Sequence, residues 1–294
     1  MRSLLKLIID EALLRKVSMN RLTPLIRSSQ VALFRFDHPA EEIHKDPPEE
    51  VALQHSVSFV ESGQFDLLIG RRQWRLFPGM VFITNPNLRY RCRHLEQVPN
   101  DVCLSISYMG SFARDVQRIT DERARPVVPV IRSSNRLAYL RFVLTRLADN
   151  RGDILALETI AGELLAAAAG ESGNEKKRYT DRQVSWYAER VEAVRALLAT
   201  RFAEPHSLSS LGAAVGMSPF HFARVFRDLV GTPPHRYLLR VRLAEAAARL
   251  RQGASVTDTC FAVGFTNLSH FIRLFRRTFG VSPSCFHTLR YNRK

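Results

Sequence analysis

Short hydrophobic runs broken by turn-forming residues fill the chain from about residue 30 to residue 108, a pattern that predicts β-strands. Gly63, Gly70 and the pair Pro78-Gly79 are among the residues that separate the runs. Many short strands this close together are typical of a small barrel or sandwich. The predicted strands are 31–36, 56–60, 65–69, 74–77, 81–84, 88–93 and 102–108.

The hydrophobic period becomes helical between residues 110 and 170, where two amphipathic helices are predicted. The leucine stripe from Leu137 to Leu147 packs either on its own domain or on a partner subunit, and the pattern leaves both readings open. A small, polar and charged stretch follows and predicts a solvated linker. We therefore expect domains at 1–170 and 183–294, joined by a linker at 171–182, with the second domain helical throughout.

An internal repeat occupies the last third of the chain. Residues 214–216 and 262–264 are both Ala-Val-Gly, at an offset of 48. After one inserted residue the offset becomes 49, and it then aligns Phe222, Arg224, Phe226 and Gly231 with Phe271, Arg273, Phe275 and Gly280. Both copies have the order helix, tight turn, helix, so two helix-turn-helix units are predicted, at about 207–231 and 255–280.

Residue types at the ends of these helices agree with the predicted boundaries. Ser207 and Ser255 are good N-caps for the first helix of each unit, and Asn267 is a good N-cap for the second helix of the second unit. Gly231 and Gly280 follow the second helices, where glycine commonly ends a helix. A long helix from the Thr232-Pro233-Pro234 segment to about residue 252 is predicted to join the units.

The second helix of each unit has one hydrophobic face and one outward face. Hydrophobic residues at helical spacing are predicted to face the core. Arginine can donate two hydrogen bonds to guanine, and apolar atoms can touch the thymine methyl group, so the outward residue types suit base reading in the major groove. A solvated surface arginine is the alternative, which the repetition at equal positions disfavours. The predicted base-facing residues are Phe220, Ala223, Arg224, Arg227, Ser269, Ile272, Arg273 and Arg276.

Charge and composition narrow the choice of partner. The formal net charge is +15, and residues 181–294 carry 17 Lys and Arg against seven Asp and Glu. A polyanion is therefore the expected partner of the second domain. His221, Arg236, Arg240 and Arg242 are candidate phosphate contacts, which position a protein on DNA without reading its sequence.

Cysteine spacing and the amino terminus add three expectations. Cys92, Cys103, Cys260 and Cys285 form no CxxC pair and have no neighbouring histidine pattern that suits zinc, so we expect reduced thiols and no metal or other cofactor. The apolar run near the start of the chain is too short to span a membrane and lacks a cleavage site, so a cytoplasmic protein without a membrane anchor is expected. Met19 would also serve as a start of the chain, as an alternative to Met1.

Residues 208–290 closely resemble the AraC/XylS-type transcriptional regulators. The resemblance lies in Gly-Met-Ser-Pro-Phe-His-Phe at 216–222, Arg-Val-Arg-Leu-Ala at 240–244, Gly-Phe-Thr-Asn at 264–267 and Phe-Gly-Val-Ser-Pro at 279–283. It implies a seven-helix DNA-binding module in which six of the outward residues lie toward the bases, namely Phe220, Ala223, Arg224, Ser269, Ile272 and Arg273. Ile272 and Leu268 are apolar where such proteins often carry polar residues, so the second unit is expected to contribute more through phosphates than through bases.

The first domain resembles the cupin-like sensor barrel of that family more loosely, through residues 63–65 and 78–81. An α+β protein is therefore expected, with a cupin-like β-barrel and appended helices followed by the all-α domain. Its four histidines lack the clustering of cupin metal ligands. His55, Phe59 and Tyr90 are candidate effector-pocket residues, although a structural barrel histidine is the alternative for His55.

Two classes of function are compatible with this reading. The first is a DNA-binding regulator, more often an activator in the resembled family. It would act as a homodimer on double-stranded promoter DNA, respond to a small-molecule effector and contact RNA polymerase. The second is a cupin-type enzyme carrying a DNA-binding module. A His/Glu metal cluster or an oriented nucleophile would favour the enzyme, and the sequence shows neither.

Overall fold

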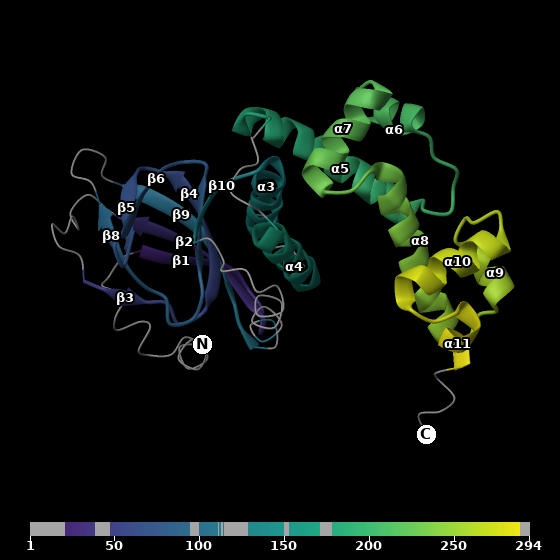
Figure 1. The fold of residues 1–294 in the computed structure, drawn as a ribbon. Coiled ribbons are helices and arrows are strands. Elements are labelled where there is room, and N and C mark those ends of the chain that lie inside the picture. Colours follow the sequence, from purple (N-terminus) through teal and green to yellow (C-terminus); the bar gives the residue numbers. More distant parts are fainter. Residues whose placement is uncertain are drawn as a thin grey trace. The chain divides into compact units, whose positions relative to one another are not determined.

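The computed structural model describes residues 21–38, 48–94, 100–110, 112, 114, 129–149, 153–170 and 178–288. The chain folds into two compact units, Met1–Tyr179 and Thr180–Lys294, which run from purple to teal and from green to yellow in Figure 1. The first unit ends inside the range predicted as a linker, of which residues 171–177 lie outside the described part.

The first unit contains two antiparallel sheets. The larger has the strand order β1-β2-β9-β4-β7-β10 and the smaller has the order β3-β8-β5-β6. Within the described residues the strands thus form two sheets instead of one closed barrel. The strands are β1 (Arg21–Arg27), β2 (Val31–His38), β3 (Glu50–Val51), β4 (His55–Ser62), β5 (Phe65–Ile69), β6 (Arg72–Leu76), β7 (Met80–Thr84), β8 (Arg89–His94), β9 (Asp101–Tyr108) and β10 (Val130–Arg132).

The predicted strands are confirmed, and three strands were missed. β1 contains Pro24, which cannot donate to a strand ladder, and the structure accommodates it on the outermost strand of the sheet beside a register shift. β3 and β10 have two and three residues, which is too short for a hydrophobic pattern to be recognised. A domain rich in β-structure with appended helices is nevertheless what the sequence predicted.

The larger sheet has one face toward the smaller sheet and one toward two helices. Val60, Phe82 and Cys103 lie in the apolar core between the sheets, together with Leu67 of the smaller sheet. The other face packs against α3 (Asn135–Asp149) and α4 (Ile154–Gly170), where the Tyr108 hydroxyl donates to the carbonyl of residue 161 at 2.9 Å. The leucine stripe of α3 is buried within its own unit, which settles the alternative in favour of packing on the sheet.

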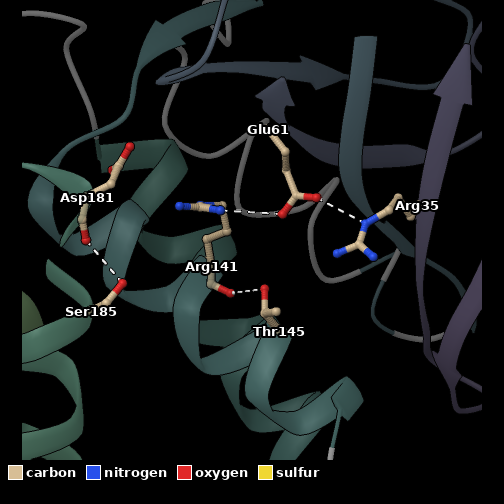
Figure 2. Close-up of polar contacts among 6 residues, drawn as sticks. All are labelled: Arg35, Glu61, Arg141, Thr145, Asp181 and Ser185. Carbon is tan, nitrogen blue, oxygen red and sulfur yellow. Dashed lines mark hydrogen bonds and ion pairs between the residues drawn. The ribbon is translucent and has the colours of Figure 1, made fainter. Parts of the chain in front are cut away.

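An ion-pair network fastens α3 to this face. Figure 2 shows the Glu61 carboxylate between two guanidinium groups, one from β2 and one from α3. The Arg35 Nε donates to Glu61 Oε2 at 3.0 Å, and the Arg141 Nη1 donates to Glu61 Oε1 at 3.4 Å. Because Glu61 is largely removed from solvent, these charge-assisted bonds hold sheet and helix in one arrangement.

The second unit is helical, as predicted. It consists of α5 (Asp181–Thr200), α6 (Leu208–Ala214), α7 (Pro219–Val230), α8 (Pro234–Arg251), α9 (Val256–Ala262), α10 (Leu268–Phe279) and α11 (Pro283–Thr288). Figure 1 shows α8 running between the α6–α7 pair and the α9–α10 pair. Phe222 and Phe226 are fully buried in the first pair, and Phe271 and Phe275 are fully buried in the second.

The helix ends match the sequence signals. The side chains of Ser207, Ser255 and Asn267 each accept a backbone hydrogen bond at a helix start. Gly231 and Gly280 both have a φ of 77° and end α7 and α10 in the left-handed conformation. The sequence thus predicted the pieces of both helix-turn-helix units.

The two turns differ in one respect. Gly216 and Gly264 occupy equivalent positions with φ of 67° and 87°. A Cβ on Gly216 would meet open space, whereas a Cβ on Gly264 would lie 2.5 Å from the backbone oxygen of Ala203. The second turn is therefore packed directly against the connection between α5 and α6.

This difference gives a matched pair of substitutions. Gly216→Ala should lower the free energy of unfolding by about 1 kcal/mol through backbone strain. Gly264→Ala should cost about 1–3 kcal/mol more, because backbone must also move. The chain has two tryptophans, so urea unfolding in a Trp74→Phe background reports the second unit through Trp186. Equal costs for the two alanines would contradict the close packing.

Candidate nucleic-acid interface

The predicted outward residues of the first unit share one face of α7. Phe220, Ala223, Arg224 and Arg227 are spaced at i, i+3, i+4 and i+7, which places them along one side of a helix. Phe220 is 87% exposed although it is a large apolar side chain, and both arginines are exposed. The opposite side of α7 is buried. We call these four residues the α7 outward face.

The equivalent residues of the second unit line a shallow, open groove on α10. Ser269, Ile272, Arg273 and Arg276 lie along it, and we call these four the α10 outward face. Arg277 and Gly280 complete the lining. Arg277 was not among the predicted residues, although it continues their stripe at i+8 from Ser269; the equivalent residue in α7 is Asp228. The structure thus brings all four predicted residues of α10 together in one concave surface.

These two faces combine cationic donors with exposed apolar groups. α10 carries three arginines and no acidic residue, and α7 carries two arginines and Asp228. The Arg227 Nη2 lies 3.8 Å from the Asp228 carboxylate; the Arg227 side chain is 57% exposed and that of Asp228 is 12% exposed. Guanidinium groups suit guanine edges and phosphates, and the apolar side chains suit thymine methyl groups.

His221 is engaged within the protein. Its Nε2 lies 3.0 Å from the Tyr187 hydroxyl of α5, and its Nδ1 lies 2.9 Å from Arg224 Nη2. Both ring nitrogens therefore have protein partners, in contrast with the predicted phosphate contact. Tyr187 was missed by sequence reasoning, because it is 34 residues from His221 and no local pattern links them.

Arg242 has a structural role instead of the predicted phosphate contact. Its Nε donates to the carbonyl of Phe202 at 2.7 Å, its Nη1 to that of Gly264 at 2.8 Å, and its Nη2 to that of Glu204 at 2.9 Å. Burial lowers the pKa of Arg242 from its ordinary value. The guanidinium joins α8 to the α5–α6 connection and to the α9–α10 turn.

The two other predicted phosphate contacts on α8 are accessible to solvent. Arg236 and Arg240 are exposed, four residues apart on successive turns of the helix. They therefore stay candidates for contact with a polyanion.

The three candidate effector residues are not brought together. His55 and Phe59 alternate with Ser56 and Ser58 on β4, and they share the face of the larger sheet that α3 and α4 cover. His55 is buried, and its Nδ1 lies 3.0 Å from Asn85 Oδ1. Tyr90 instead packs between the sheets, and its hydroxyl donates to Glu50 at 3.0 Å.

The surroundings of Tyr90 keep it a neutral hydrogen-bond donor. Burial, followed by the neighbouring Glu50 charge, raises the pKa of Tyr90 above its ordinary value. The sequence placed these residues on strands correctly but could not assign their faces, so the predicted pocket is wrong as a set.

Among the described residues, no three His, Cys, Asp or Glu side chains are grouped so that they could hold a metal ion. No helix within these ranges is long and apolar enough to cross a membrane.

Comparison with known proteins gives matches in both units. Residues 41–165 match the family described as the AraC-like ligand binding domain, and residues 211–288 match a helix-turn-helix domain family. The HTH-type transcriptional activator RhaS of Escherichia fergusonii is 32% identical over 238 residues, which cover 78% of this chain and 83% of that protein.

Two more similarities concern the last third of the chain. RhaS of Escherichia coli is 36% identical over 97 residues, which cover 33% of this chain and 35% of that protein. The crystal structure of a probable AraC family transcriptional regulator from Rhodopseudomonas palustris is 30% identical. That match covers 35% of this chain and 97% of the other, with a TM-score of 0.33.

The role of Arg242 predicts a specific loss of stability. Arg242→Lys should lower the free energy of unfolding of the second unit by about 2–4 kcal/mol, because one ammonium group cannot reach three carbonyls in different directions. Arg240→Lys is the matched control on the exposed side of α8 and should change it by less than about 0.5 kcal/mol. Urea unfolding followed by Trp186 fluorescence measures both, and equal midpoints would rule out the structural role.

Proposed function

The chain belongs to the AraC family of transcriptional regulators, and we propose that it binds promoter DNA through the outward faces of α7 and α10. It is a DNA-binding regulator with an N-terminal ligand-binding domain. The assignment of the individual residues that contact DNA is our proposal.

One observation carries this proposal. Two equivalent helices, 49 residues apart in sequence, carry exposed arginines at the same helical positions, Arg224 and Arg273, and each also leaves one apolar side chain exposed on its outward face, Phe220 on α7 and Ile272 on α10. Phe220 is 87% exposed and therefore adds little buried surface to its unit, whereas phenylalanine and the neighbouring Arg224 both suit contact with base edges. Arg224 and Arg273 would each read bases in a major groove.

The helix between the two units has a suitable length. α8 has 18 residues, so it is about 27 Å long. Successive major-groove segments on one side of DNA lie roughly 34 Å apart. Two reading helices at the ends of such a strut can enter neighbouring segments, and Arg236 and Arg240 would contact phosphates between them. The resulting site would be long and non-palindromic for each copy of the chain.

The remaining partners are proposed from the family. RhaS is named as a transcriptional activator, which supports activation through RNA polymerase by this chain as well. Ile154 and Leu155 are exposed apolar residues at the start of α4 and support a homodimer contact in the first unit. Regulation of a promoter requires access to the chromosome, so we propose a cytoplasmic protein. Within the described residues, nothing favours the alternative of a cupin-type enzyme.

Base reading predicts a local change in specificity. Arg224→Ala and Arg273→Ala should each lower the affinity for a duplex selected by the wild-type chain by about 5- to 150-fold. Each variant should also lose its preference at one or two base pairs only. Selection from randomised duplexes followed by fluorescence anisotropy measures both effects. Unchanged binding and unchanged preference in both variants would contradict the assignment of the two faces.

Arg236→Ala is the matched control for phosphate contact. It should weaken binding to selected and scrambled duplexes equally and lower the slope of log K against log salt by about 1. A change in base preference in this variant would show that Arg236 reads sequence.

Effector sensing predicts a linked change in stability and DNA affinity. A small molecule present at 100 times its Kd should stabilise the first unit by about 2.7 kcal/mol. In the full chain, the unfolding of the first unit is reported by Trp74 in a Trp186→Phe background. Compounds from a panel of sugars, amino acids, carboxylates and nucleosides are then tested for a change in affinity for the selected duplex. Stabilising compounds that all leave this affinity unchanged would contradict the sensor role.

A further inference from the structure

We propose that Tyr187 and His221 position Arg224 for base contact, so that α5 sets part of the DNA specificity of α7. The proposal rests on the proposed function of Arg224. Three side chains from two helices form a continuous chain of hydrogen bonds from the Tyr187 hydroxyl through the His221 ring to the Arg224 guanidinium.

The chemistry of the three side chains fixes which atom donates and which accepts in each of the two hydrogen bonds. Arginine has only donors, so His221 Nδ1 must accept the bond from Arg224 Nη2. The proton of the neutral imidazole then lies on Nε2, which donates to the Tyr187 oxygen. Only one tautomer of the neutral ring satisfies both contacts, and the arrangement holds the ring in one orientation.

Packing holds Tyr187 on the α7 side of α5. α5 packs against α7, and its buried residues Val184, Ala188 and Val191 determine which side of α5 faces the core. The Tyr187 ring also contacts the His221 ring edge to face, with centroids 5.4 Å apart. His221 is half-buried by this contact, whereas Arg224 remains exposed. The Tyr187 and His221 rings are therefore half-buried between the two helices, and the Arg224 side chain is at the surface.

The second unit provides an internal comparison. His270 and Arg273 have the same i, i+3 spacing and align with His221 and Arg224 at the offset of 49. His270 is exposed, and its ring contacts Phe265 with centroids 6.1 Å apart. The same sequence pair thus has an anchored histidine in the first unit and a solvent-exposed histidine in the second, because α5 lies against α7.

An anchored arginine binds differently from a solvated one. A long side chain that is already ordered in the free protein loses less conformational freedom when it meets its target. The hydrogen bond also restricts the directions in which Arg224 can point, and this restriction disfavours duplexes with guanine at a displaced position. Tyr187 and His221 would therefore affect affinity and base preference through Arg224, without touching DNA.

A double-mutant cycle in the full chain tests the proposal. Tyr187→Phe keeps the ring but removes the hydroxyl, and it should lower the affinity for the selected duplex by about three- to ten-fold. In an Arg224→Ala background the same change should have no further effect, because the group through which it acts is gone. In an Arg273→Ala background, which keeps Arg224, Tyr187→Phe should lower the affinity by the same factor as in the wild-type chain. His221→Phe, which removes both ring nitrogens, should behave like Tyr187→Phe.

Tyr237→Phe is the matched control. The Tyr237 hydroxyl accepts a bond from Arg195 of α5 at 3.2 Å, so this variant, like Tyr187→Phe, removes a tyrosine hydroxyl that makes one hydrogen bond at an α5 contact. Tyr237→Phe should leave the base preference unchanged. Urea unfolding followed by Trp186 fluorescence shows whether each variant is folded. A Tyr187→Phe loss that persists in the Arg224→Ala background, or a wild-type affinity for Tyr187→Phe, overturns the proposal. Failure of the wild-type chain to prefer any duplex would instead overturn the proposed function.

Discussion

The arrangement of the second unit depends on the hydrogen bonds that the Arg242 guanidinium donates to backbone carbonyls. It satisfies three backbone carbonyls that belong to two separate connections, one before α6 and one between α9 and α10. Carbonyl groups taken from water need such donors. Because Arg242 is on α8, one side chain joins the strut to segments 22 and 40 residues away in sequence. The contact of Gly264 with Ala203 closes the same junction without any side chain.

This junction explains how two short helical pairs can act as one DNA-binding surface. α6 and α9 have seven residues each and are too short to be stable alone. Each pair buries its phenylalanines against α8 and its neighbours, and the junction limits rotation of the second pair about the strut. Two outward faces whose separation is fixed can meet successive grooves together. Units that moved independently would lose conformational freedom on binding, and this loss would lower the affinity.

Sequence reasoning succeeded where function and structure depend on local chemistry. Helix caps such as Ser207 and left-handed glycines such as Gly280 follow from interactions within a few residues, and the outward stripes follow from helical period. It failed where a residue's role depends on a distant partner. Arg242 looks like any exposed arginine until three carbonyls surround it, and Tyr187 gains its role only through His221. Tyr90 and His55 were assigned to one pocket because alternation does not tell which face of a strand meets which layer.

The same distinction separates the two halves of the proposed DNA-binding surface. Both outward faces are encoded by one repeated pattern, but among the described residues the hydrogen-bonded restraint from α5 reaches Arg224 on α7. Helix α5 begins at Asp181, directly after the boundary between the two compact units, with a capping box at Thr180 that fixes its first turn. A rotation of α5 would move Tyr187 and change the restraint on Arg224. A signal that reaches α5 would therefore act directly on the α7 outward face.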